Sequence, residues 1–484
     1  MIIQGGMGAG VSGWPLARAV SETGNMGVVA GTAIATIFAR RLQRGDEGDH
    51  LRRALKAFPH PEIAARVWEK YFQADGNSGN PTFKLNPMPG MRPSRNLLEL
   101  TVLASFTEVF LAKEKNTGPV GINLLEKIQL PTLATLFGSM LAGVDYVLMG
   151  AGIPRTIPGV LDRLASHEKV ALNLDVDGAL PGEKFTTTFD PVEFRGGSLP
   201  SLKRPKFLGI VSSSALATTL ARKAEGKVDG FIVEGTAAGG HNAPPRGPLQ
   251  LTPEGEPVYS ARDVPEIDKI RNLGLPFWLA GAYGRPGKLS EALDLGAAGI
   301  QVGTAFAFCE ESGIRPDIKA ETIRLSIKGQ TRVFTDPYAS PTGFPLKVVQ
   351  MSGTLSEREV FEARPKKCDL GYLRRAYRRP DGTVGYRCPG EPEEDYLKKG
   401  GTLAETEGRK CVCNGLLGTI GLGQTLETGE AEPALVTAGD DASLVAEFLQ
   451  PGRSSYSAMD VVNRLMNGDR ERAESASLAQ HNTI

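Results

Sequence analysis

The chain has 484 residues, and 55 acidic side chains balance its 55 basic ones, so its formal net charge is zero. This balance excludes the whole-molecule field with which a protein attracts nucleic acid or an anionic membrane surface, and we expect neither partner. With 41% hydrophobic and 23% charged residues, the composition is that of an ordinary soluble globular protein.

Eight short apolar runs recur through the first two thirds of the chain. Each run is apolar through its whole length and is followed by glycine or a small polar residue. This pattern is typical of strands in a parallel sheet that is covered on both faces. The expected strands are residues 2–3, 26–30, 120–124, 146–149, 207–211, 231–233, 277–280 and 300–302.

Segments with helical periodicity separate these runs. In residues 131–142 the first residue is a proline, which suits a first helical turn, and residues 289–295 are followed by a glycine, a usual helix stop. Residues 158–164 and 214–222 are further examples. Eight strand–helix units predict an α/β fold, a TIM (β/α)8 barrel, over residues 1–313. A doubly wound parallel sheet is the alternative.

Two stretches interrupt the repeat and are expected to be insertions, at about residues 45–100 and 168–205. The first contains an expected helix at residues 63–71. The second contains an apolar run at residues 170–176 and a threonine-rich run at residues 185–189, which suggest a hairpin. Because an eight-stranded barrel has no place for a ninth strand, we expect this hairpin outside the barrel.

Residues 314–484 differ from the expected barrel in composition and in hydrophobic pattern. Charge rises, strand-like runs vanish, and helices are expected at about residues 318–328 and 356–363. We therefore expect an appended, mainly helical and irregular C-terminal region. Its last residues, 468–484, are polar, and we expect them to be loose.

The most informative segment is residues 233–242, where an expected strand runs into a glycine-rich loop. The small residues from Gly235 to Gly240 leave room for the backbone to approach a ligand closely. His241, one of five histidines, follows them. An isolated histidine is more often a polar loop residue, but this context predicts a catalytic acid or base beside a flat cofactor.

Glycines also follow the last two expected strands, where TIM barrels often bind phosphate on backbone N–H groups. Gly281 and Gly303 have no side chain to block a phosphate, and Thr304 adds a hydroxyl and an N–H. The expected first strand runs into residues 4–10, which lack bulk and could lie against a flat ring. Asn123, at the end of the expected third strand, could reach the same ring.

These motifs together resemble the nitronate monooxygenase family, also called the 2-nitropropane dioxygenase family. The resemblance covers roughly residues 1–310, and FMN-dependent enoyl-acyl-carrier-protein reductases share the pattern. It implies a TIM barrel that holds FMN, with His241 at the substrate side of the flavin. The residues that it assigns to the cofactor are Gly5, Gly6, Met7, Asn123, Gly239, Gly240, Gly281, Ala282, Gly303 and Thr304.

The chain departs from the family pattern at three positions. Ala237 stands where the family usually has a polar side chain, Asn242 where it has glycine, and Ala282 where it has a second glycine. These changes are compatible with FMN binding and bear on the substrate.

Three functions remain open at this level. The first is oxidation of alkyl nitronates with O2 by an FMN-dependent nitronate monooxygenase. The second is NAD(P)H-dependent reduction of an enoyl thioester in lipid or polyketide synthesis. The third is a non-catalytic flavin-binding assembly subunit. The sequence leaves the oligomeric state open, a homo-oligomer included.

The N-terminal residues and the number of cysteines indicate the cellular compartment, and the spacing of the cysteines bears on metal binding. Residues 1–6 lack the pattern of a signal peptide, no apolar stretch reaches the ~20 residues that span a bilayer, and five cysteines make no disulfide scaffold. We expect a cytoplasmic protein with reduced thiols. Cys368, Cys388, Cys411 and Cys413 could hold zinc or an iron–sulfur cluster, but paired Cys-x2-Cys motifs are missing, and ordinary thiols without a metal are favoured.

Overall fold

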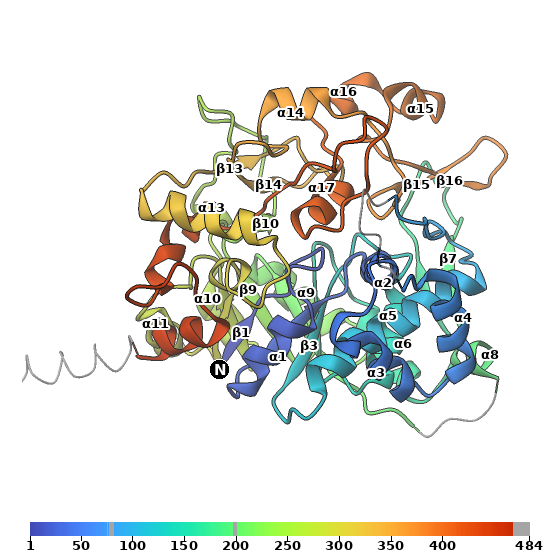
Figure 1. Cartoon of the computed structure of the whole chain (residues 1–484), viewed down its shortest axis with the longest axis horizontal. Helices are drawn as coiled ribbons and strands as arrows, with labels where there is room; N and C mark the ends of the chain where they lie inside the picture. Colours follow the sequence, from blue (N-terminus) through green and yellow to red (C-terminus); the bar gives the residue numbers. More distant parts are fainter. Residues whose placement is uncertain (75, 77–81, 197–200, 468–484) are drawn as a thin grey trace, which may run out of the picture.

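The computed structural model describes residues 1–74, 76, 82–196 and 201–467. Its centre is a barrel of eight parallel strands (Figure 1). A parallel bridge between Ile3 and Met26 joins the first strand to the second and closes the sheet. The TIM barrel and all eight expected strands are therefore confirmed, and the doubly wound sheet is not found. The barrel strands are β1 (Ile2–Gln4), β2 (Gly27–Ala30), β3 (Val120–Leu125), β4 (Tyr146–Gly150), β8 (Lys206–Val211), β9 (Gly230–Glu234), β11 (Phe277–Ala280) and β12 (Gly299–Val302).

A helix follows each barrel strand before the next one begins, and the strands are buried on both faces. Ile3, Leu148 and Ile232 are among the side chains that fill the barrel interior. Local signals fix the helix starts: the Ser213 side chain accepts a hydrogen bond from the N–H of Leu216 at an N-cap. These helices are α1 (Trp14–Glu22), α2 (Ile34–Gln43), α6 (Thr132–Leu141), α7 (Ile157–Ala165), α9 (Ser214–Lys223), α10 (Ile267–Arg271), α11 (Lys288–Asp294) and α12 (Thr304–Ala307).

The first insertion adds helices to one side of the barrel. The expected helix at residues 63–71 is present as α4, and α5 is the longest helix in the described residues. Helix α5 packs against α1, α2 and α6, and most of its side chains are buried. The insertion helices are α3 (His50–Ala57), α4 (Pro61–Tyr71) and α5 (Arg95–Lys113).

The second insertion lies outside the barrel, as expected. Strands β5 (Val170–Asn173) and β7 (Thr186–Phe189) pair antiparallel as a separate two-stranded sheet. The short helix α8 (Pro191–Arg195) follows. Between β5 and β7, strand β6 (Val176–Asp177) leaves the hairpin and pairs with the appended region.

The appended region is mainly helical and irregular, but the expectation that strands vanish there is wrong. Four strands form: β13 (Val333–Asp336), β14 (Leu346–Val349), β15 (Arg375–Arg378) and β16 (Val384–Arg387). They were missed because each has four residues, and β15 and β16 carry arginines on a partly exposed surface. The helices are α13 (Pro316–Ile327), α14 (Arg358–Ala363), α15 (Glu393–Lys398), α16 (Leu403–Thr406), α17 (Val412–Thr419) and the 3-10 helix η3 (Asp440–Phe448).

Barrel and appended region are joined by two small three-stranded sheets. The loop strand β10 (Gly240–His241) pairs antiparallel with β14, and β14 pairs with β13. On the other side, β6 pairs with β15 and β15 with β16. Each sheet thus combines a strand from a barrel loop or insertion with strands from the appended region.

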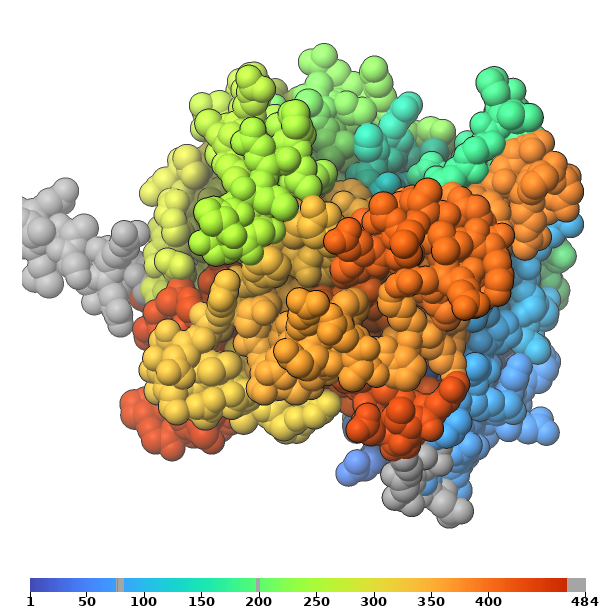
Figure 2. Space-filling model, turned by 90° about the horizontal axis from the view of Figure 1, so that it is seen from above, coloured from blue at the N-terminus to red at the C-terminus, as the bar shows by residue number. Residues whose placement is uncertain are grey.

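The appended region covers one end of the barrel. In Figure 1 the helices α14, α15 and α16 lie along the top of the molecule with α17 below them, and Figure 2 shows that face with the orange and red segments spread over its middle. Helix η3 packs against α12 and α13. Val349, Ala438 and Phe448 belong to the same buried hydrophobic cluster as Phe306 of the barrel. In the described part of the chain, no helix combines the length and apolarity that crossing a membrane requires.

Candidate functional site

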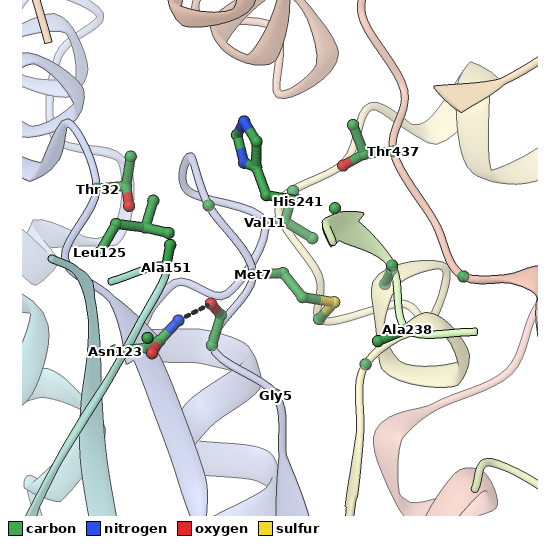
Figure 3. Close-up of a pocket in the computed structure, with 18 of the residues that line it drawn as sticks. Gly5, Met7, Val11, Thr32, Asn123, Leu125, Ala151, Ala238, His241 and Thr437 are labelled. Atoms are coloured by element: carbon green, nitrogen blue, oxygen red, sulfur yellow. Dashed lines mark hydrogen bonds between the residues drawn. The ribbon is translucent and has the colours of Figure 1, made fainter. Parts of the chain in front are cut away.

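One cavity of about 220 Å³ lies where the carboxyl ends of the barrel strands meet the appended region. It brings together every residue that the sequence predicted for the cofactor and for catalysis, although they come from five separate segments (Figure 3). Whether these residues bind a flavin stays a prediction. The predicted residues that line the cavity are Gly5, Gly6, Met7, Asn123, Gly239, Gly240, His241, Gly281, Ala282, Gly303 and Thr304.

Asn123 is fixed against the N-terminal loop. Its Nδ2 donates a hydrogen bond to the carbonyl oxygen of Gly6 over 2.7 Å, as the dashed line in Figure 3 shows. A Cβ atom at Gly6 would lie 2.2 Å from the Cβ of Asn123, so only glycine fits there. The Oδ1 atom of Asn123 is buried and has no hydrogen-bond partner among the described residues, and the same is true of Oε1 of Gln301 on β12. The cavity therefore offers two acceptors that still lack donors.

The loops after β11 and β12 present free backbone donors at another end of the cavity. For the N–H groups of Gly281, Ala282 and Gly303, no acceptor is found in the part of the chain that the structure covers. Gly281 has a φ of +93°, which favours glycine, and Ala282 has a φ of +58°. The alanine thus adopts the left-handed conformation that a glycine would take there. Unpartnered N–H groups at strand ends suit an anion such as a phosphate.

The structure adds a carboxyl group to this end, which sequence reasoning missed. Asp441, at the start of η3, lines the cavity. Burial raises the pKa of its carboxyl, while a hydrogen bond from the Thr304 hydroxyl and the charge of Arg285 act in the opposite direction. Thr304 Oγ1 also accepts a hydrogen bond from the N–H of Gly439 over 2.9 Å. The hydroxyl predicted for a phosphate is therefore engaged with the appended region.

A second carboxyl group, that of Glu234, lies at the end of β9 and also lines the cavity. Burial raises its pKa to about 7, so it takes up a proton near neutral pH. A charged residue at the carboxyl end of a barrel strand is a usual signal of function, and this signal was present in the sequence.

His241 is held from the appended region. As part of β10 it pairs with Leu346 of β14, and its Nε2 lies 2.6 Å from the hydroxyl of Ser340. Ser340 is fully buried, and its hydroxyl lies 2.8 Å from that of Thr342. Figure 3 shows the imidazole on the upper side of the cavity, with Met7 and Asn123 below it.

The electrostatic state of His241 follows from its burial. Desolvation lowers the pKa of the imidazole to about 4, so the ring is neutral at neutral pH. A neutral ring can donate or accept a hydrogen bond, but it is a weak base and brings no positive charge. The contribution of His241 to an anionic ligand would therefore be a hydrogen bond.

The appended region supplies an apolar wall opposite the strand ends. Leu346, Tyr372, Leu373 and Leu416 line the cavity from this side. The hydroxyl of Tyr372 lies 3.0 Å from that of Thr36, which fixes the wall to the barrel. No pattern in the sequence connects these residues with the glycine loops, because they lie far apart in the chain.

Comparisons with known proteins bear on this site. Residues 195–336 match the sequence model of the family described as Nitronate monooxygenase, and this stretch includes His241 and the loops after β11 and β12. The match confirms the family resemblance expected from the sequence. No curated protein matches the chain.

Solved structures with a similar fold include three whose identity to this chain is 15% or lower. FabK from Thermotoga maritima is 15% identical with a TM-score of 0.49, over 98% of this chain and 94% of that one. A nitroalkane oxidase from Streptomyces ansochromogenes is 15% identical with a TM-score of 0.47, over 98% and 97%. The enoyl reductase domain of MlnA from Bacillus amyloliquefaciens is 12% identical with a TM-score of 0.50, over 98% and 96%. At sequence identities this low, the similarity is evidence about the fold alone.

Proposed function

Proceeding from the nitronate monooxygenase match, which makes the chain a flavin-dependent oxidoreductase, we propose that it binds FMN and oxidises alkyl nitronates with O2. One observation carries this proposal. A neutral histidine and unpartnered acceptors and donors line the same cavity at the carboxyl ends of the barrel strands.

The residues present fit FMN at both ends of the cavity. Asn123 Oδ1 and Gln301 Oε1 would accept from the polar edge of the flavin ring, and the lack of a side chain at Gly6 lets the N-terminal loop pack directly against Asn123. The N–H groups of Gly281 and Gly303 would donate to the phosphate. When bound, FMN supplies the electron transfer from the nitronate and the reaction with O2 that no protein side chain provides.

His241 would orient the nitronate through a hydrogen bond. A nitronate is already deprotonated, so its oxidation needs no strong base, and an imidazole with a pKa of about 4 is not one. The neutral ring donates from one nitrogen to a nitronate oxygen while Ser340 holds the other nitrogen. Below its pKa of about 7 the Glu234 carboxyl is neutral and does not repel the anion.

A second function, reduction of an enoyl thioester with NAD(P)H, is favoured by the apolar wall of the cavity. Leu346, Leu373 and Leu416 provide an apolar surface against which an acyl chain can pack. A small nitronate would bury little of this surface. In that reaction the neutral His241 would donate a hydrogen bond to the thioester carbonyl.

The reductant distinguishes these functions. The purified protein, loaded with FMN and made anaerobic, is mixed separately with propionate-3-nitronate and with NADPH while the flavin absorbance is recorded. Rapid bleaching by the nitronate supports the proposed function, and rapid bleaching by NADPH alone supports the reductase. Bleaching by neither points to a flavin-binding subunit without catalysis. A protein that stays colourless after incubation with FMN contradicts all three.

A further inference from the structure

Four of the five cysteines gather at one place in the appended region, outside the proposed reaction. They line a small second cavity, although they come from three separate segments, and Cys413 also lines the main cavity. Of the residues that the structure describes, no three His, Cys, Asp or Glu side chains are arranged to hold a metal ion. Thiols that meet at one cavity can react with one another. The four residues are Cys368, Cys388, Cys411 and Cys413.

The surroundings of these thiols make them chemically unequal. Hydrogen bonding with Cys388 and the positive charge of Arg374 lower the pKa of Cys368 against the effect of burial. The pKa of Cys388 is raised well above its usual value, by Cys368 and by burial. Burial also raises the pKa of Cys411, to about 11, and that of Cys413. Since the thiolate is the nucleophile, Cys368 is the reactive member, and Cys388 is the neutral thiol beside it.

We propose that Cys368 and Cys388 are a peroxide-reactive pair that closes to a disulfide. The Cys368 thiolate attacks hydrogen peroxide, the O–O bond breaks, and a sulfenic acid and hydroxide form. The Cys388 thiol then attacks the sulfenic sulfur, the S–S bond forms, and water leaves with the thiol proton. Overall, two thiols are oxidised and one peroxide is reduced to two waters. A reactive cysteine next to a resolving one is the usual arrangement of a redox-sensitive pair.

Both segments that carry the pair are anchored on either side of the cavity. The Asn414 side chain donates to Asp369 over 2.7 Å, which ties the residue after Cys368 to helix α17. The N–H of Cys388 donates to Glu391 over 3.3 Å, and Lys399 donates to the same carboxylate. These contacts fix the backbone beside each thiol without involving sulfur.

The disulfide would act on the wall of the main cavity. Leu373 and Val412 line both cavities, as Cys413 does. A covalent link between residues 368 and 388 would therefore restrain the wall that faces the proposed substrate.

The test is a thiol count on the full-length protein. The protein is treated with hydrogen peroxide at equimolar concentration, denatured, and titrated with a chromogenic disulfide reagent. We expect the free thiols to fall from five to three, and to return to five after a dithiol reductant. Peptide mass spectrometry should then find one linked pair, Cys368 with Cys388.

Matched variants decide the assignment. Cys368→Ser should lose no thiols to peroxide, whereas Cys411→Ser, at the same cavity, should still form the Cys368–Cys388 link. Circular dichroism checks that each variant is folded. The rate at which iodoacetamide alkylates Cys368 in the folded wild-type protein is an independent measure of the reactivity of this thiolate. A constant thiol count, a different linked pair, or thiols protected by a tightly bound metal until chelation would overturn the proposal.

Discussion

The imidazole of His241 reaches the cavity as a neutral group, and Ser340 holds one of its nitrogens. We predict that His241→Asn keeps FMN and lowers kcat about 100-fold, because loss of a positioned hydrogen-bond donor typically costs that much in rate. Absorbance of the bound flavin and steady-state kinetics with the active reductant measure the two effects. An unchanged kcat would remove His241 from the mechanism.

Ser340 is a positioning residue, because its buried hydroxyl lies between the imidazole of His241 and the hydroxyl of Thr342. Ser340→Ala leaves a buried nitrogen of His241 without a partner, which costs about 1–3 kcal/mol. We expect kcat to fall about tenfold, which is the 1.4 kcal/mol equivalent, with FMN affinity unchanged. Thr342→Val removes only the outer hydroxyl and should have the smaller effect. Equal losses of FMN binding in both variants would indicate a general structural role.

We predict that Asp441 makes the affinity for FMN depend on pH. Because burial raises the pKa of its carboxyl, the side chain is neutral at low pH and becomes anionic as pH rises through that raised pKa. The anion repels a phosphate bound at the nearby glycine loops, so the Kd for FMN should increase with pH. Asp441→Asn should bind FMN more tightly at high pH and lose this increase. Fluorescence titration measures the Kd, and riboflavin, which lacks the phosphate, is the control that should show no increase.

Sequence and structure differ most clearly at single residues. Glycines and His241 were predicted to lie together because each follows an expected strand, and parallel strands end at one edge of the barrel. Ser340 and Asp441 could not be predicted, because their role depends on how the appended region folds back over that edge. Glu234 is predictable from the sequence, because it is a charged residue at the end of an expected barrel strand.

At the scale of elements, strand length and burial decided what the sequence could reveal. The barrel strands are buried on both faces, so their apolar runs were recognisable from end to end. Strands β15 and β16 contain three arginines in eight residues, and β15 takes its partner β6 from a distant insertion. Their pairing is a tertiary interaction, and local sequence does not carry it.

One buried ion pair in the appended region ties the end of α14 to the loop that carries Glu432. Arg364, at the end of α14, donates to Glu432 over 2.5 and 3.0 Å, and their side chains are only 5% and 1% exposed. Arg364→Met leaves the carboxylate buried without its partner, so we expect a loss of about 3–5 kcal/mol in the free energy of unfolding. The double variant with Glu432→Leu should recover most of it, because neither charge of the pair is then left without its partner. Denaturant unfolding measures both, and an equal loss in single and double variants would contradict the argument.

The whole molecule is the scale at which the boundary at residue 313 can be tested. Phe448 and Tyr456 pack in the same cluster as Phe306 of the barrel, and the Tyr456 hydroxyl donates to the carbonyl oxygen of Ala305 over 2.8 Å. Each large apolar side chain that is buried contributes about 1.5–3 kcal/mol, and a domain has only about 5–15 kcal/mol in total. We therefore predict that residues 1–313 alone aggregate and bind no FMN, although they contain every predicted cofactor contact. Size-exclusion chromatography measures the aggregation, and flavin fluorescence measures FMN binding. Co-expression of residues 314–484 should restore both the soluble state and FMN binding. A monomeric barrel of residues 1–313 with full FMN affinity would contradict the prediction.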